Sequence, residues 1–317
     1  MQNFIQQLPK AELHIHIEGS LEPQMLLDLA TKNKVAVKYS TIHEAKQAYR
    51  FNNLQEFLNL YYQGMSVLIT EDDFYQLTYA YLLKAHDQNV KYTEIFFDPQ
   101  AHLSRGVQFA TVINGLYRAI EQAKLVLGIE AALILCFLRD LAEDDAIKTL
   151  ELALDYRDKF IGVGLDSAEI NNPPSKFKHV FALARDYKLH LVAHAGEEGS
   201  SQYIWDAIDI LGVERIDHGV QAMNDFALMK RLAKDKIPLT MCPLSNQSLQ
   251  VVPDLTNYPI REFLNAGMTV TINSDDPAYF GGYINANYLA LAQSLNLTRY
   301  ELDILAKNSL QARFHHV

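Results

Sequence analysis

Residues 190–199 of the chain read His-Leu-Val-Ala-His-Ala-Gly-Glu-Glu-Gly, an apolar run of strand length that ends in polar residues. The apolar side chains do not alternate cleanly with polar ones, which is typical of a strand buried on both faces of a parallel sheet. Seven other short apolar or alternating runs share this character. They are Glu12–Ile17, Tyr92–Phe97, Ala131–Leu138, Ile161–Leu165, Arg215–Asp217, Ile237–Met241 and Met268–Ile272.

Helical patterns occupy the intervals between these runs. Phe109–Leu127 predicts a helix that ends at Gly128, and Asp144–Asp158 predicts an amphipathic helix with acidic residues in its first turn. Eight β-then-α units in this order predict an α/β fold of the TIM (β/α)8 barrel type. The other predicted helices are Lys176–Tyr187, Ser201–Leu211, Asp225–Asp235 and Ile260–Ala266.

The chain is predicted to form a single barrel domain over residues 1–317, because no repeat, low-complexity segment or Pro/Gly-rich linker divides it. The interval from Pro23 to Asn89 is too long for one crossover between adjacent strands. It predicts several helices inserted after the first strand, at about 23–89, where they could form a lid over the barrel mouth. His315 and His316 are expected to be exposed tail residues.

Composition narrows the class of ligand. Hydrophobic residues make up 49% of the chain and charged residues 21%, the balance of an ordinary globular protein. The net charge of −10 disfavours nucleic acid and anionic membranes as partners, so we expect a small neutral or cationic ligand. The two cysteines, Cys136 and Cys242, are too few for a disulfide framework, and no apolar stretch resembles a signal peptide or membrane span. These features predict a cytoplasmic protein.

Polar residues follow the predicted strands at the ends where a barrel builds its active site. Each cluster alone is explained equally well by a turn or by the start of a helix, but their coincidence at successive strand ends predicts one shared pocket. The clusters are His14-Ile15-His16-Ile17-Glu18-Gly19, Asp166-Ser167-Ala168-Glu169, His194-Ala195-Gly196-Glu197-Glu198, Asp217-His218-Gly219, Cys242-Pro243-Leu244-Ser245-Asn246 and Asn273-Ser274-Asp275-Asp276-Pro277.

Three imidazoles and one carboxylate in this set suit a metal ion. Strand alternation places His14 and His16 on the same side of the first strand. With His194 and Asp275 they would bind one Zn²⁺ per chain and leave a position open for water, which is the mark of a catalytic zinc site. Fe²⁺ and Mn²⁺ also suit this ligand set.

These motifs resemble the adenosine and adenine deaminase family of the amidohydrolase superfamily. The resemblance runs from about residue 10 to residue 283 and rests on Glu-Leu-His-Ile-His, His-Ala-Gly-Glu, Asp-His-Gly and Ser-Asp-Asp-Pro, which begin at residues 12, 194, 217 and 274. It implies a metal-dependent deaminase barrel with the zinc ligands named above.

The resemblance also implies roles for the remaining residues. Glu197 matches the proton donor to the purine ring, His218 the residue that orients the attacking water, and Asp276 the residue that holds purine N7. Attack at C6 pushes charge onto N1, so a carboxylic acid with a raised pKa is needed there. Asp275 would be both a metal ligand and an acceptor for the zinc-bound water. Ser167, Gly196 and Glu18 are further candidate substrate contacts.

Two departures from the adenosine-specific branch bear on the substrate. That branch carries Asp and Gly where this chain has Glu18 and Glu169. A carboxylate at Glu169 could accept the N9–H of a free base, and its bulk would crowd a ribose. The strings at residues 96–100, 165–167, 242–246 and 278–283 also look more like the adenine deaminase branch. We therefore predict deamination of adenine to hypoxanthine and ammonia, with adenosine and N6-substituted adenines as alternatives.

Three other interpretations remain open. Residues 51–58 resemble the family's helical gate, although a rim helix that only packs on the barrel has the same pattern. A two-metal hydrolase is an alternative because Asp166 and Glu169 could bridge two ions, and metal stoichiometry would separate the two. A barrel that binds metal or purine without chemistry is disfavoured, because Glu197 and His218 are not needed to hold a metal.

Overall fold

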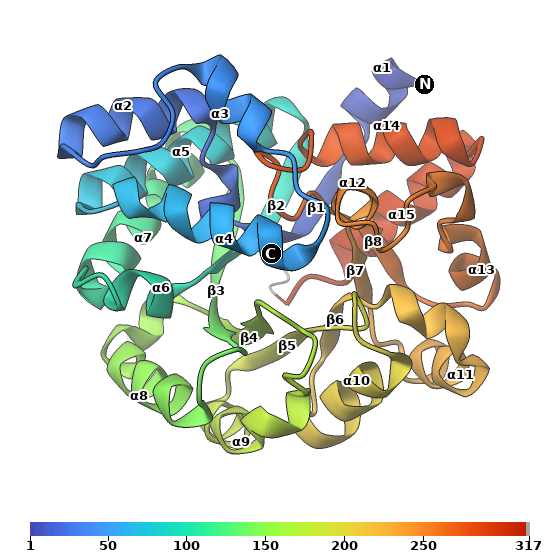
Figure 1. The fold of residues 1–317 in the computed structure, drawn as a ribbon. Coiled ribbons are helices and arrows are strands. Elements are labelled where there is room, and N and C mark those ends of the chain that lie inside the picture. Colours follow the sequence, from blue (N-terminus) through green and yellow to red (C-terminus); the bar gives the residue numbers. More distant parts are fainter. Residues whose placement is uncertain (315–317) are drawn as a thin grey trace.

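The computed structural model of the protein describes residues 1–314, so His315 and His316 lie outside the described residues. Eight parallel strands follow one another around a barrel in chain order, and helices surround them (Figure 1), which confirms the predicted TIM-barrel architecture. The strands are β1 (Lys10–His16), β2 (Val90–Phe97), β3 (Glu130–Leu138), β4 (Gly162–Asp166), β5 (His190–Ala195), β6 (Arg215–His218), β7 (Leu239–Met241) and β8 (Val270–Ile272).

The barrel closes between β8 and β1 through a short and unusual contact. Residues just after β8 complete the pairing: the Asp275 amide donates to the His14 carbonyl (3.1 Å), and the His16 amide donates to the Asp275 carbonyl (3.0 Å). Closer to the other end of β1, the Leu13 amide donates to the side-chain oxygen of Asn273 (2.8 Å). Two metal-ligand candidates on β1 are therefore fixed directly against a third at the end of the sheet.

The outer helices lie where the sequence predicts them, but two of the predicted helices are divided into shorter ones. α7 (Phe109–Leu127) matches its prediction and ends at Gly128, whose φ of 67° a glycine adopts without strain. The predicted helix 144–158 divides into α8 (Glu143–Ala153) and a 3-10 helix (Leu154–Lys159). Residues 201–211 divide into α10 (Ser201–Asp206) and a π-helical turn (Ala207–Leu211).

Five helices were not predicted from the sequence. α15 packs against β1 and β8 and supports the closing seam, because Ser309 Oγ accepts the Ala11 amide (2.9 Å). The five are α1 (Gln2–Gln7), α6 (Pro99–Leu103), α12 (Pro243–Ser248), α14 (Ile284–Ser294) and α15 (Arg299–Gln311). The remaining outer helices are α9 (Lys178–Asp186), α11 (Phe226–Asp235) and α13 (Ile260–Asn265), and the other 3-10 turns are Glu18–Ser20, Met65–Val67, Pro174–Phe177, Val220–Asn224 and Leu255–Asn257.

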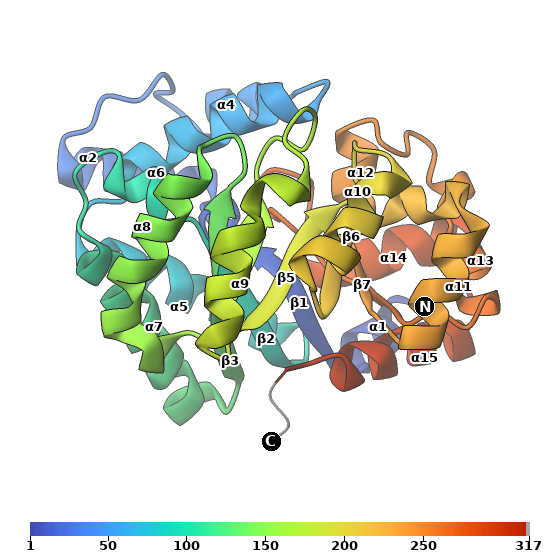
Figure 2. The ribbon, with the colours of Figure 1, turned by 90° about the horizontal axis from the view of Figure 1, so that it is seen from below.

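Four helices fill the interval after β1: α2 (Pro23–Asn33), α3 (Ile42–Ala48), α4 (Leu54–Gly64) and α5 (Glu71–Asp87). α5 packs beside α7 in the outer ring, so the added helices are α2 to α4. The side chain of Asn53 caps α4 by accepting the Glu56 amide. α4 lies across one end of the barrel (Figure 2).

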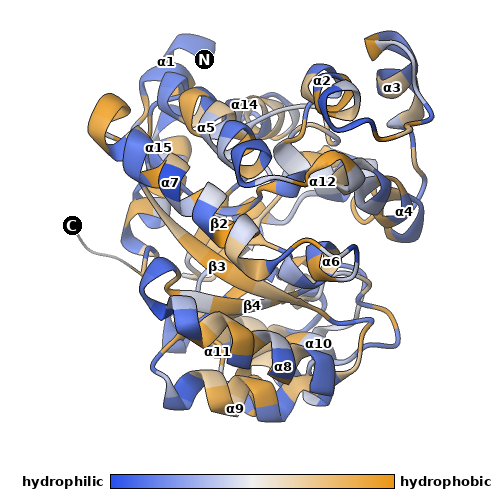
Figure 3. Ribbon diagram, turned by 90° about the vertical axis from the view of Figure 1, so that its left-hand side faces the viewer, coloured by the Kyte–Doolittle hydropathy of each residue, from blue (hydrophilic) through white to orange (hydrophobic). Residues whose placement is uncertain are grey.

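The core consists of the strands and the inner faces of the helices. The colouring in Figure 3 shows β3 and β4 as apolar ribbons inside a shell of helices of mixed polarity. Both cysteines are buried free thiols. Among the described residues, no helix combines the length and hydropathy that crossing a membrane requires.

We expect Asn273→Ala to lower the free energy of unfolding by about 1–3 kcal/mol, because it leaves the buried Leu13 amide without an acceptor at the closing seam. Urea titration followed by circular dichroism measures the change. Asn224→Ala, at an exposed position, is the matched control and is expected to change stability by no more than about 0.5 kcal/mol. Equal stability of the two variants would contradict a role for Asn273 in closure.

Candidate active site

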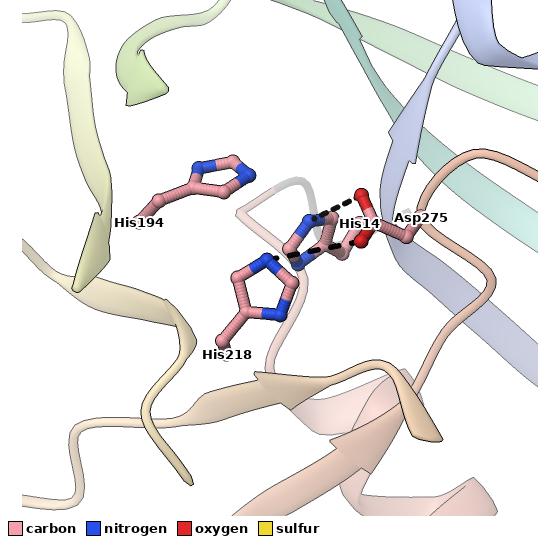
Figure 4. A group of neighbouring side chains, drawn as sticks. All are labelled: His14, His194, His218 and Asp275. Carbon is pink, nitrogen blue, oxygen red and sulfur yellow. Dashed lines mark ion pairs between the residues drawn. The ribbon is translucent and has the colours of Figure 1, made fainter. Parts of the chain in front are cut away.

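Four predicted metal ligands meet at one end of the barrel. His14 Nε2 lies 3.3 Å and His16 Nε2 3.5 Å from Asp275 Oδ1, and His16 Nε2 lies 3.1 Å from His194 Nε2. All four side chains are buried. Figure 4 shows His14 and His218 beside the Asp275 carboxylate, with His194 farther from it.

These distances fit a single divalent cation. Four ligands at 2.0–2.1 Å from a tetrahedral metal stand about 3.3 Å apart, and three of the separations among these donor atoms are 3.1–3.5 Å. The donor atoms of His14, His194, His218 and Asp275 all lie within 4.8 Å of one another, so His218 adjoins the same cluster. His14 Nε2 is buried and has no hydrogen-bond partner. Burial lowers the pKa of His16 to about 3, so its imidazole is neutral. Two neutral imidazole nitrogens that face each other at 3.1 Å are well placed to share a cation.

Hydrogen bonds outside the cluster orient the ring nitrogens toward it. His14 Nδ1 contacts the Thr240 carbonyl (3.1 Å), which leaves Nε2 free to bind a metal. The Thr240 hydroxyl donates to Asp217 Oδ1 (2.7 Å), and Asp217 Oδ2 lies 3.7 Å from His194 Nδ1. On the other side, Asp166 Oδ2 lies 3.5 Å from His16 Nδ1.

A second polar group adjoins the cluster. His218 Nε2 lies 3.5 Å from Glu197 Oε2 and 3.8 Å from Asp275 Oδ2. The amide nitrogen of Asn246 lies 3.3 Å from both Glu197 Oε1 and His218 Nδ1, and its oxygen accepts the Tyr258 hydroxyl (2.7 Å). Asn246 thus connects the two side chains. The sequence showed Asn246 as one polar residue after the seventh strand, with no signal for this function.

The environment determines the protonation of these groups. Burial, followed by the charge of Asp275, raises the pKa of Glu197 well above its ordinary value, which favours the protonated form of the side chain. Burial lowers the pKa of His218 to about 3, so its imidazole is a neutral acceptor. The same effects of burial and of Asp275 raise the pKa of Asp276. The site therefore contains both proton donors and proton acceptors.

The position of the Asp276 side chain requires a glycine at residue 19. Its Oδ1 is buried without a partner. A Cβ added to Gly19 would lie 1.9 Å from this oxygen, so only glycine leaves room for the carboxyl group.

A cavity lies next to the cluster and α4 forms its roof. Asp98, Asp166, Ser167, Glu197 and Asp276 line its polar wall. The roof is apolar and aromatic, as suits a flat heterocycle. The residues that α4 contributes are Leu54, Phe57, Leu58, Tyr61 and Tyr62.

Three predicted substrate contacts are turned away from this cavity. Glu169 is saturated, because its carboxylate accepts the amides of residues 196, 197, 198 and 199 at 2.7–3.0 Å. The Gly196 amide donates its hydrogen bond to Glu169, and Gly196 packs against Ile204. Glu18 Oε1 accepts the Asp98 amide (3.2 Å) and contacts His102 Nε2 (2.8 Å). Backbone amides and a buried imidazole hold these carboxylates, so neither lines the cavity.

Ser167 does line the cavity, with its Oγ 2.9 Å from the hydroxyl of Tyr62 on α4. Its φ is +72°, and His218 (+66°) and Asp275 (+63°) share the left-handed conformation. Such backbone costs free energy in a residue with a side chain and clusters at functional sites. Here it occurs directly at strand ends, where it turns polar side chains toward the cavity.

Comparison with known proteins agrees with this site. The adenosine deaminase family model matches residues 9–316. An adenine deaminase from Crocosphaera subtropica is 56% identical over 99% of this chain and 96% of its own. The crystal structure of an adenine deaminase from Arthrobacter aurescens superposes with a TM-score of 0.96 at 45% identity, over 98% of this chain and 94% of that one. An amidohydrolase from Burkholderia ambifaria with bound Zn gives 0.91 at 25% identity, covering 99% and 88%.

We expect Glu169→Ala to destabilise the protein by on the order of 3 kcal/mol or more, because four buried amides lose their shared acceptor. Glu169→Gln should have a smaller effect, since its remaining oxygen can still accept. Chemical denaturation of both variants, with the half-buried Glu198→Gln as control, measures the difference. If Glu169→Ala is as stable as the control, its carboxylate does not hold the 196–199 turn.

Proposed function

The chain belongs to the adenosine deaminase family, and we propose that it hydrolyses free adenine to hypoxanthine and ammonia. The observation that carries this proposal is the buried cluster of histidines with Asp275, in which three donor separations are 3.1–3.5 Å, beside a carboxyl group with a raised pKa in a cavity with an aromatic roof. The full-length similarity to adenine deaminases supports the same substrate.

We infer that the metal is a single Zn²⁺ held by His14, His16, His194 and Asp275. The donor separations and the zinc in the related amidohydrolase support this choice. A bound zinc supplies an acidified water at neutral pH, because coordination lowers the pKa of water to roughly 7.

Side chains of the protein move the protons. A water between His218 Nε2 and Asp275 Oδ2, which are 3.8 Å apart, can give a proton to either group as its oxygen attacks C6. Glu197, protonated because it is buried, gives its proton to N1 as charge develops there. The leaving amino group takes one proton that came from the water, and ammonia departs. The second water proton returns to Glu197, so the step balances.

Asp276 and α4 orient the ring in this proposal. A protonated Asp276 carboxyl can donate to N7, which lacks a proton in the common tautomer of adenine. The aromatic side chains of α4 cover the ring face and exclude water. α4 therefore has the position of a gate, and substrate entry requires it to move.

The two-metal alternative requires carboxylates that bridge two ions, and one of the two candidates, Glu169, is not free to do so. Glu169 is occupied by four amides and is not available to a second ion. Asp166 remains beside His16, with its Oδ2 3.5 Å from His16 Nδ1. One ion per chain is therefore the expected stoichiometry.

We expect the zinc-loaded protein to release ammonia from adenine with a kcat/KM at least about 100-fold above that for adenosine. A coupled ammonia assay with adenine, adenosine and N6-methyladenine measures this ratio, and metal analysis of the same sample gives the stoichiometry. Equal turnover of adenosine would overturn the free-base assignment. Absence of ammonia from all three substrates would overturn the proposed function.

Glu197→Gln is expected to lower kcat for adenine by at least about 100-fold while one zinc per chain remains bound, because glutamine cannot protonate N1. Its pair, Glu198→Gln, removes a neighbouring carboxylate that does not line the cavity and should retain activity within a few-fold. Retained turnover in Glu197→Gln would refute the proton-donor assignment, and loss of zinc would show that the variant damages the metal site instead.

A further inference from the structure

Asp98 presents an unused hydrogen-bond acceptor to the cavity. It follows β2 directly, it is 2% exposed, and it lines the cavity. Its Oδ2 accepts the hydroxyl of Tyr61 on α4 (3.3 Å), while its Oδ1 has no partner. A buried carboxylate oxygen without a donor is costly unless a ligand supplies one.

Contacts behind Asp98 hold it in this position. The Asp98 amide donates to Glu18 Oε1 (3.2 Å), which also lies 2.8 Å from His102 Nε2. Arg105 Nη2 lies 2.7 Å from His102 Nδ1. The chain thus uses three buried or half-buried side chains to fix an acid that no step of the reaction uses.

Two clusters of side chains that both contain His16 help to locate Asp98 relative to the residues proposed to contact the ring. Ligating atoms of His16, Asp275 and Asp276 lie within 4.8 Å of one another, and so do those of His16, Asp98 and Asp166. Asp98 and Asp276 therefore both lie near His16, on the His16 side of the cavity. Glu197 is in neither group and instead contacts His218 and Asn246.

The chemistry of the purine suits this arrangement. With N1 toward Glu197 and N7 toward Asp276, the imidazole edge faces the wall that contains Asp98. A free base has one ring N–H on that edge, at N9 in the common tautomer, and a nucleoside has none because N9 carries the sugar. A buried acceptor placed to meet this ring N–H favours the free base over a ring substituted at N9, which has no donor at that position.

We propose that Asp98 accepts the ring N–H of the free base and so determines the preference for bases without a substituent on N9. Asp166, beside it on β4, keeps its own carboxylate toward His16 and completes the polar wall. Asp98 would thus accept the ring N–H that the sequence analysis assigned to Glu169. The inference rests on the proposed function.

The test compares Asp98→Asn with the zinc-loaded wild-type protein. The side chain keeps its size, but its amide nitrogen competes with the oxygen for the position that faces the substrate. We expect KM for adenine to rise at least tenfold while kcat falls less than threefold. The inhibition constant of 9-methyladenine, which lacks the ring N–H, should change less than threefold. Asp144→Asn, an exposed acid on α8, is the control and should leave all three values unchanged.

Several results would overturn the inference. They are an unchanged KM, a fall in kcat alone, or equal rises in KM and in the 9-methyladenine inhibition constant. If 9-methyladenine binds neither protein, the KM and kcat of adenine decide. Two metal ions in the wild type and one in Asp98→Asn would show that Asp98 binds a cation instead. Failure of the wild type to deaminate adenine would refute the proposed function, whereas an active wild type with an unaffected variant would refute this inference alone.

Discussion

The site depends on how the barrel closes. The Asp275 backbone pairs with the carbonyl of His14 and the amide of His16, so one residue serves both as the last contact of the sheet and as a candidate metal ligand. Because these hydrogen bonds are backbone contacts, the two imidazoles and the carboxylate are placed before any metal binds. The donor atoms consequently need little reorganisation, which is the condition for a preorganised centre.

Buried charge is the second feature that the fold has to accommodate. Many buried carboxyl groups lie at this end of the barrel, in a protein whose net charge is −10, and six of them illustrate how their environments differ. Asp275 faces the imidazoles, Glu169 is surrounded by amides, and Glu197 and Asp276 are held neutral by burial and by Asp275. In the proposed reaction, acids of the same type would serve as ligand, anchor and proton donor, according to their partners. The other two members are Glu18 and Asp98.

The sequence was sufficient to predict the architecture and a buried His/Asp site at the ends of the strands, because both depend on short local patterns. The exact ligand set stays a prediction, since His218 also lies within 4.8 Å of His14, His194 and Asp275. Strand-length apolar runs, and polar residues directly after them, report barrel strands and their active ends without knowledge of the loops. The sequence analysis expected the Glu169 carboxylate to face the substrate, whereas in the structure it accepts backbone amides of residues 196–199. The resemblance to the family places Glu169 at the end of a strand. The partners of its carboxylate, however, depend on how the 196–199 turn folds back over it, which the sequence pattern does not show. Asn246 and Asp98 were missed for the same reason, since their contacts cross between strands.

α4 links substrate recognition to closure of the cavity. Tyr61 donates to Asp98, and Tyr62 contacts Ser167, so two hydrogen bonds join the roof to the polar wall. The roof otherwise rests on an aromatic cluster that includes Phe57, Tyr279 and Phe280. A helix held by apolar contacts alone would close over any flat ring of suitable size. One of the two hydrogen bonds ends on Asp98, the carboxylate proposed to accept the ring N–H. In that proposal the same acid would contact both α4 and the base, so substrate binding at Asp98 would act on a partner of α4.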